Sequence, residues 1–176
     1  MRLCSSSFGK ICEAQSTATL ERLAKSLVSQ QSFTTQATRY GRLNEQPALT
    51  AYIKTTGNNL RSSGLVISVC QPFIASSQDG IVRDSVVVEV KCPDISHMKP
   101  VTPFLCERDG KLILKSNHDY YYQIQGQLYT TNQQLCELVI YTLVDLKVLV
   151  VVHDDSFINA MVVNLVTFLL NISNLL

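Results

Sequence analysis

The six-residue stretch Val86–Lys91 constrains the fold more than any other part of this 176-residue sequence. Four of its residues are valine, and such a run of β-branched side chains predicts a strand that packs on both faces. The other two residues, Glu89 and Lys91, are two positions apart, so their side chains project from the same face. A carboxylate and an ammonium are costly to bury unpaired. We therefore expect the fold to bring neutralising groups to that face.

A second carboxylate, that of Asp79, stands ten residues before Glu89, and Asp79-Gly80 is typical of a turn. Two carboxylates beside a backbone carbonyl would form an all-oxygen pocket suited to Mg²⁺ or Mn²⁺. Lys91 could then place a water and stabilise negative charge on a phosphate. Spacing alone leaves another interpretation open. Glu89 and Lys91 could form an ordinary ion pair on a solvated edge strand, and the Asp-Gly pair could be only a turn.

Helix-like and strand-like patterns follow one another through the rest of the chain and suggest a mixed α/β domain. Helices are expected over 16–30, from 42–45 to about 53, over 119–129 and over 157–176, and strands over 65–70, 72–75, 138–141 and 147–152. A polar loop is expected over 30–36. Pro47 fits the second helix only in its first turn, where a missing N–H would be unpaired in any case.

The last predicted helix raises the question of a membrane span. Its apolar part, Met161–Leu176, has only sixteen residues, whereas a bilayer needs about 20. Four of its polar residues fall on one stripe of the helix, namely Asn164, Thr167, Asn171 and Asn174. We therefore expect a core helix packed on a sheet and no membrane contact.

Length and composition indicate one globular domain over residues 1–176. A net charge of +1 excludes a histone-like nucleic-acid binder. Residues 1–61 hold eight basic and three acidic side chains, or +5, so a polyanion would be drawn there unless these charges are an ordinary scatter.

The six cysteines form no CxxC pair and no signal sequence precedes them, which predicts reduced thiols in an intracellular protein. The histidine and cysteine spacings predict no zinc site.

Four blocks of the sequence, in order, resemble one nuclease family. They are Arg2–Ile11, Gly41–Tyr52, Ala75–Val82 together with Val88–Pro93, and Tyr120–Leu128. The pattern Asp79…Glu89-Val-Lys91 is similar to the catalytic motif of the PD-(D/E)xK nuclease superfamily. The four blocks together narrow the resemblance to its lambda exonuclease branch, the YqaJ-type viral recombinases or alkaline exonucleases. Glu-x-Lys is common by itself, but the four blocks together are specific.

The resemblance implies a restriction-endonuclease-like core, in which α-helices flank a central mixed β-sheet. It also implies roles for individual side chains. Asp79 and Glu89 would bind Mg²⁺ or Mn²⁺ together with the Val90 carbonyl, and Lys91 would activate the attacking water. Glu45 would reach a second metal, or its waters, from a helix.

Further residues have implied roles around this centre. Gln123 would hold the nucleophile or the catalytic lysine in place, and Ser6 would lie where the family grips a terminal phosphate. Arg2, Arg39 and Arg42 belong to the basic first third of the chain. They would contact the DNA backbone, because phosphate contacts need no reading of sequence.

The implied reaction is metal-dependent hydrolysis of linear duplex DNA from a 5′ end, which generates single strands for annealing recombination. The implied partners are DNA ends, a single-strand annealing protein and further copies of the chain, in the cytoplasm or nucleus.

The family's usual upstream segment is missing, so the domain is expected to be shortened at its N-terminus. The direction of digestion, from the 5′ or the 3′ end, is therefore left open. The alternative is a catalytically weak or inactive module that binds DNA or a partner on the same scaffold.

Overall fold

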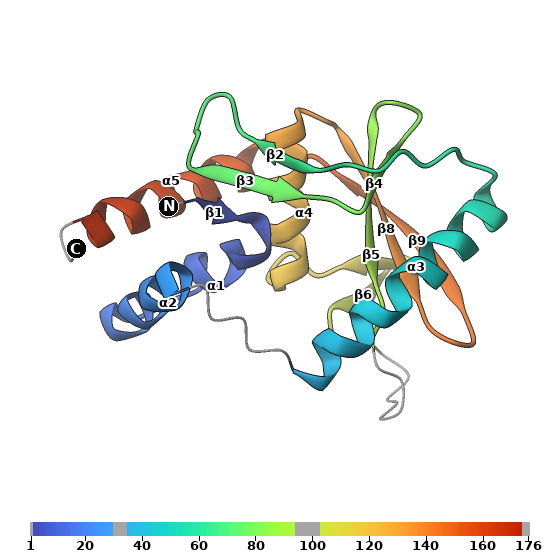
Figure 1. Cartoon of the computed structure of the whole chain (residues 1–176), viewed down its shortest axis with the longest axis horizontal. Coiled ribbons are helices and arrows are strands. Elements are labelled where there is room, and N and C mark those ends of the chain that lie inside the picture. Colours follow the sequence, from blue (N-terminus) through green and yellow to red (C-terminus); the bar gives the residue numbers. More distant parts are fainter. Residues whose placement is uncertain (1, 30–34, 94–102, 174–176) are drawn as a thin grey trace.

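The computed structural model describes residues 2–29, 35–93 and 103–173 and has a mixed α/β architecture (Figure 1). Its α-helices are α1 (Phe8–Cys12), α2 (Thr17–Ser29), α3 (Gln36–Thr56), α4 (Asp119–Thr131) and α5 (Asp155–Ser173). Its strands are β1 (Leu3–Cys4), β2 (Leu65–Ile67), β3 (Ile74–Ser77), β4 (Gly80–Val82), β5 (Val86–Lys91), β6 (Leu105–Arg108), β7 (Lys111–Leu114), β8 (Leu135–Tyr141) and β9 (Leu146–Val152). A 3₁₀ turn, η1 (Ser5–Ser7), joins β1 to α1.

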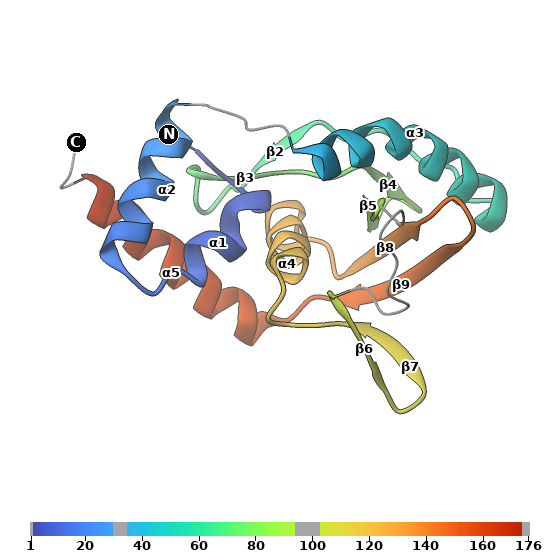
Figure 2. The ribbon, with the colours of Figure 1, turned by 90° about the horizontal axis from the view of Figure 1, so that it is seen from below.

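The larger sheet has the strand order β4-β5-β8-β9 and holds β5 in its interior. β5 pairs in parallel with β8 and antiparallel with β4, while β9 lies antiparallel to β8 at the far edge. Parallel neighbours need a crossover connection, and α4 provides it. Helix α4 packs on one face of this sheet and α3 on the other (Figures 1 and 2). The predicted central mixed sheet flanked by helices is confirmed.

The valine-rich strand predicted from the sequence is β5, with the predicted ends. Val87 belongs to the apolar cluster beneath α4, whereas the other three valines belong to the cluster beneath α3. Because side chains alternate along a strand, Glu89 and Lys91 share the α4 face with Val87. The strand therefore presents its two charged side chains to the helix that follows it in the chain.

Helix α3 begins earlier than the sequence pattern predicts. It starts at Gln36 because Thr35 caps it, with the Thr35 Oγ1 accepting a hydrogen bond from the Thr38 N–H at 3.2 Å. Pro47 consequently lies inside the helix, where one backbone hydrogen bond is lost, and its predicted place in the first turn is wrong. Ala48, Leu49 and Tyr52 follow Pro47 and are buried against the larger sheet. This packing stabilises the helix despite the lost bond.

A second group of helices, α1, α2 and α5, lies beside a small sheet with the order β1-β3-β2 (Figure 2). The buried residues of α5 form one cluster with α1, α2, and Leu3 and Ile74 of the small sheet. The predicted core helix is therefore confirmed, although its neighbours are chiefly helices rather than a sheet. The described members of its polar stripe are exposed, and so are Val163 and Leu170.

The stretch Asp155–Ile172 of α5 is long and apolar enough to cross a membrane when judged by length and composition alone. A single such helix in the described part of the chain is weak evidence for a span, because core helices of soluble proteins meet the same criteria. Its buried residues, from Ile158 to Ile172, lie in the core cluster described above.

Several predicted boundaries differ from the structure. The predicted strands 65–70 and 72–75 correspond to the shorter β2 and to β3, which is shifted by two residues. The strand predicted over 138–141 is β8 and begins earlier, at Leu135, because Asn132 ends α4 in the left-handed conformation with φ of 54°. Most of the predicted loop over 30–36 lies outside the described residues.

Candidate active site

Glu89 and Lys91 form the centre of the candidate site. The Lys91 Nζ lies 2.7 Å from Oε1 of Glu89 and donates to Oε1 of Gln123 at 2.9 Å. Gln123 Nε2 in turn donates to the same Glu89 oxygen at 2.6 Å, so the three side chains close a triangle between β5 and α4. Glu89 is 3% exposed and β5 is an interior strand. An ion pair on a solvated edge strand is thereby excluded.

The surroundings of Lys91 keep its ammonium protonated. Burial lowers its pKa, but the charge of Glu89 and the hydrogen bond to it outweigh burial, so the pKa lies above its ordinary value. The ammonium also lies 4.6 Å from the centre of the Tyr120 ring, which adds a cation–π contact. Lys91 is therefore a fixed positive charge and hydrogen-bond donor rather than a free base.

Asp79 reaches this centre from the segment between β3 and β4. Strand β4 pairs with β5 only as far as Val88, so the N–H of Val90 lies beyond the end of β4. Oδ2 of Asp79 accepts a hydrogen bond from that N–H at 2.6 Å. Burial first, and then the negative charges of Glu89 and Glu45, raise the pKa of Asp79 to about 7.

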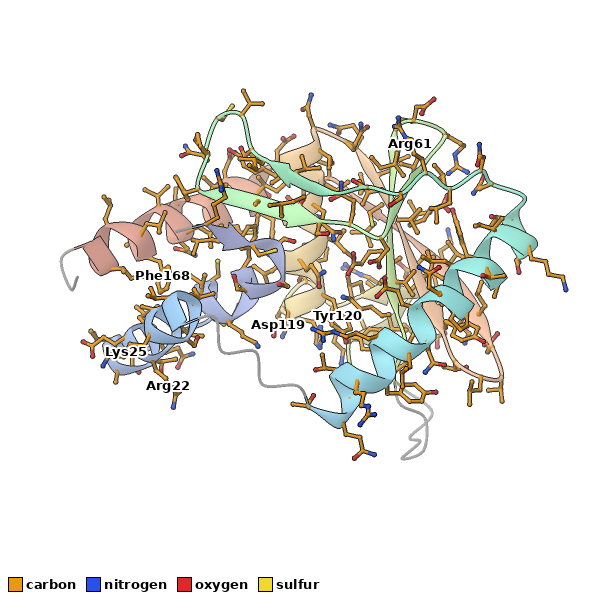
Figure 3. The ribbon with its side chains drawn as sticks, in the orientation of Figure 1. Arg22, Lys25, Arg61, Asp119, Tyr120 and Phe168 are labelled. Carbon is orange, nitrogen blue, oxygen red and sulfur yellow. The ribbon has the colours of Figure 1, made fainter. Side chains whose placement is uncertain are left out.

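These groups line one cavity of about 390 Å³ between α3, β5 and the start of α4. Its polar lining includes Glu45 from α3, Asp79, Glu89 and Lys91, and the backbone of Val90 borders it as well. Tyr120, labelled in Figure 3, closes the cavity from the α4 side. The structure thus gathers in one place all the residues predicted for catalysis and metal binding, with Gln123 contacting Glu89 and Lys91 from α4.

The four residues predicted to contact phosphate or DNA are all exposed, and none of them lines the cavity. Arg39 and Arg42 lie on α3, within two turns of Glu45. Arg2 and Ser6 flank β1, in the part of the molecule that contains the small sheet. Ser6 belongs to η1, which packs against α4. These residues therefore come from two parts of the fold, α3 and the segment around β1, and their roles stay predictions.

Gln127 is a site residue that the sequence reasoning missed. It is fully buried, and its Nε2 donates to Oε2 of Glu89 at 2.6 Å. Gln127 stands four positions after Gln123, and residues at this spacing share one face of a helix. That spacing, in a helix already expected to face the site, is the signal that could have identified it.

The oxygen atoms at this centre suit a hard divalent cation. In the described part of the chain, Oδ1 of Asp79 accepts no hydrogen bond and Oε2 of Glu89 accepts only one, so both keep lone pairs for a cation. Burial first, and then the negative charges of Glu89 and Glu45, raise the pKa of Asp79, and a cation would relieve that crowding of charge. Among the described residues, no three His, Cys, Asp or Glu side chains approach closely enough to hold a metal by themselves. A backbone oxygen and waters would have to complete the coordination, as Mg²⁺ permits.

An interior strand with Glu-x-Lys, beside an Asp from the preceding segment and between two helices, defines the PD-(D/E)xK class of nucleases. Within that class, the chain belongs to the family of the YqaJ-like viral recombinase domain, whose family model matches residues 1–134. Membership supports a DNA exonuclease, and nucleases of this family generally use divalent metal ions and act on DNA ends.

Solved structures share the fold. An alkaline exonuclease from Laribacter hongkongensis is 21% identical, with 98% of this chain and 88% of that chain covered, at a TM-score of 0.75. Its complex with dAMP gives a TM-score of 0.76 at the same identity and coverage. A phage related exonuclease from Haemophilus somnus is 16% identical, with 96% and 92% covered, at a TM-score of 0.72. No curated protein sequence matches the chain.

Proposed function

We propose that the chain is a Mg²⁺- or Mn²⁺-dependent exonuclease that hydrolyses linear duplex DNA from 5′ ends. One observation carries this proposal: Asp79, Glu89 and Lys91 meet in a single cavity that Glu45 borders from the opposite helix. Crowded carboxylates beside a protonated lysine form a poor structural core, because each buried charge costs free energy. They form a suitable site for a reaction in which a cation and an ammonium together face a phosphate.

In this proposal Asp79, Glu89 and the Val90 carbonyl hold the first cation, and Glu45 reaches a second one or its waters. The bound cation supplies positive charge that offsets the repulsion between the phosphodiester oxygens and an incoming nucleophile. Lys91 donates hydrogen bonds to the attacking water or to a phosphate oxygen, since its ammonium has three protons and the structure uses two of them.

Gln123 fixes the direction of the lysine. Its Oε1 accepts from the Lys91 Nζ while its Nε2 donates to Glu89, so the amide keeps the ammonium beside the carboxylate. A positioned donor of this kind needs little rearrangement when negative charge develops on the phosphate. Gln123 therefore acts in this proposal through Lys91 and Glu89, not on DNA directly.

The proposed DNA path uses the exposed arginines Arg39 and Arg42 on α3, together with Arg2 and Ser6 for a terminal phosphate. Contacts of this kind are independent of sequence, as an enzyme that digests any duplex requires. The single strands left by digestion would be substrates for an annealing protein, and several copies of the chain could surround one DNA. Such an enzyme would act inside the cell, in the cytoplasm or nucleus.

Digestion of linear duplex DNA tests the proposal. Substrates with 5′-phosphate and 5′-hydroxyl ends are incubated with Mg²⁺, with Mn²⁺ or with chelator, and the length of each strand is followed. We expect metal-dependent loss of the strand with a 5′-phosphate, and no loss with chelator. Binding of DNA without degradation in either metal would contradict the proposal and favour the inactive binding module. Loss from the 3′ end would contradict only the polarity.

A further inference from the structure

Gln127 connects the two chain segments that carry the carboxylates of the site. One of its Nε2 protons goes to Oε2 of Glu89 on β5, at 2.6 Å. The other goes to the backbone oxygen of Ser77 at 3.2 Å, at the end of β3 and two residues before Asp79. An amide nitrogen has two protons, so each proton serves one of the two segments. The distance between Asp79 and Glu89 therefore depends on one side chain of α4.

Further contacts hold α4 against the same segment. Oγ1 of Thr130, one turn after Gln127, lies 2.5 Å from Oγ of Ser76, which precedes Ser77 in β3. Ser76 also donates to Oε1 of the buried Gln78 at 3.2 Å. The segment that leads to Asp79 is therefore attached to α4 at Ser76 and at Ser77, and Gln127 extends this attachment to Glu89.

Among the described residues, only the nitrogen end of the Gln127 amide is satisfied by hydrogen bonds. Gln127 is fully buried, yet in the described part of the chain its Oε1 has no hydrogen-bond partner. An unpaired buried carbonyl costs roughly 1–3 kcal/mol, and the position bears this cost while the Nε2 protons serve Glu89 and Ser77. Gln125, also fully buried on α4, differs because both ends of its amide are paired, with the Val152 oxygen and the Asp154 N–H.

We propose that Gln127 is a positioning residue, which orients Glu89 and sets its separation from Asp79 so that both carboxylates can hold one divalent cation. This inference rests on the proposed metal-dependent function. Gln123 and Lys91 occupy Oε1 of Glu89, while Gln127 fixes Oε2 and leaves it one lone pair. Partners of metal ligands act in this manner, and their removal typically weakens metal binding or activity about 10–100-fold.

The test compares Gln127→Met with Gln125→Met, because methionine keeps the length of the side chain and removes the amide in both cases. Mn²⁺ binding is measured by calorimetry without DNA, and thermal unfolding is measured in chelator. We expect Gln127→Met to bind Mn²⁺ about 10–100-fold more weakly than the wild type. We expect Gln125→Met to bind Mn²⁺ as the wild type does. The Mn²⁺ concentration for half-maximal digestion should shift by the same factor in Gln127→Met, with the rate recovering at high Mn²⁺.

Wild-type Mn²⁺ affinity in Gln127→Met would overturn the inference, and so would an equal loss of affinity in Gln125→Met, because helix packing would then explain the effect. If Gln127→Met does not fold, Gln127→Asn replaces it, since the shorter amide cannot reach both acceptors. Unchanged Mn²⁺ affinity in that variant would overturn the inference equally. A wild-type chain that neither binds Mn²⁺ nor degrades DNA would refute the proposed function itself, whereas a wild type that does both leaves the variants to decide on Gln127 alone.

Discussion

Two buried glutamates lie on neighbouring strands of the larger sheet and face opposite sides of it. Glu89 on β5 faces α4 and is 3% exposed, and Glu137 on β8 faces α3 and is 9% exposed. Glu137 pairs with the guanidinium of Arg83 and accepts a hydrogen bond from the Tyr52 hydroxyl at 2.5 Å. Burial, followed by this hydrogen bond, raises the pKa of Tyr52 to about 12, so its hydroxyl remains a donor.

The two glutamates differ in what surrounds their charge. Glu137 meets a guanidinium and a phenol, and among the residues that the structure describes no further carboxylate enters its hydrogen-bonded group. Glu89 meets one ammonium but shares its cavity with Asp79 and Glu45, so negative charge exceeds positive charge there. A neutralised buried carboxylate supports the fold, whereas a surplus of carboxylates at a cavity stores electrostatic repulsion for a ligand to relieve. Burial alone does not distinguish a structural glutamate from a functional one.

The largest expected effect on activity and stability comes from replacing Glu89 and Glu137, one at a time, by glutamine. Glu89→Gln should reduce DNA degradation by roughly 10²–10³-fold or more, as expected for loss of one preorganised charge. Glu137→Gln should instead leave the rate near that of the wild type and destabilise the fold by about 1–3 kcal/mol, because Arg83 and Tyr52 lose a charged partner. Digestion rates and thermal unfolding measure both effects. The reverse pattern would contradict the distinction between the two glutamates.

An intermediate effect is expected for Asp79→Asn. It is measured as the melting temperature at several pH values, with chelator present to remove divalent cations. The pKa of Asp79 is about 7 in the fold, against an ordinary value of 3.8, so the folded state binds its proton more tightly than the unfolded state does. Wild-type stability should therefore fall as pH rises from about 4 through 7. Asparagine cannot ionise, so Asp79→Asn should melt several degrees higher than the wild type at pH 8, since 1 kcal/mol corresponds to roughly 2–4 °C in a chain of this size. The difference should shrink at pH 5.

Added Mg²⁺ provides the control for that measurement. A cation that relieves the crowding of carboxylates should stabilise the wild type more than Asp79→Asn at pH 8, and so narrow the gap between them. If wild type and Asp79→Asn have the same melting temperature as each other at pH 8 as well as at pH 5 in chelator, ionisation of Asp79 does not destabilise the fold.

The smallest expected effect concerns the surface of α3. Replacing Arg39 and Arg42 by serine should weaken DNA binding and lower the slope of log affinity against log salt by roughly two, because each phosphate contact contributes about 0.9. Lys54→Ser is the matched control, since Lys54 is an exposed basic residue in the last turn of the same helix. Binding titrations over a range of salt concentrations measure the slopes. A change in slope of about 0.9 for Lys54→Ser, as large as the change expected per arginine, would show that the arginines contact DNA no more than another exposed basic residue of α3 does.

The sequence predicted the parts of the site that depend on local geometry. β-branched residues and strict alternation established β5 and placed Glu89 and Lys91 on one face, because a strand allows side chains only two directions. The blocks that resemble the nuclease family added Glu45 and Gln123, which no local periodicity could connect to the strand. All four of these residues meet at or beside one cavity.

Tertiary packing decided how the charges are neutralised. Gln127 reaches Glu89 from 38 positions away in the sequence, and the ring of Tyr120 reaches Lys91 because α4 crosses over β5. The interior position of Pro47 depends likewise on the burial of α3 against the sheet. Local sequence fixes the face from which each side chain projects, since that follows from backbone dihedral angles alone. Which groups meet across two elements follows from how those elements pack, because packing sums many weak contacts over the whole core.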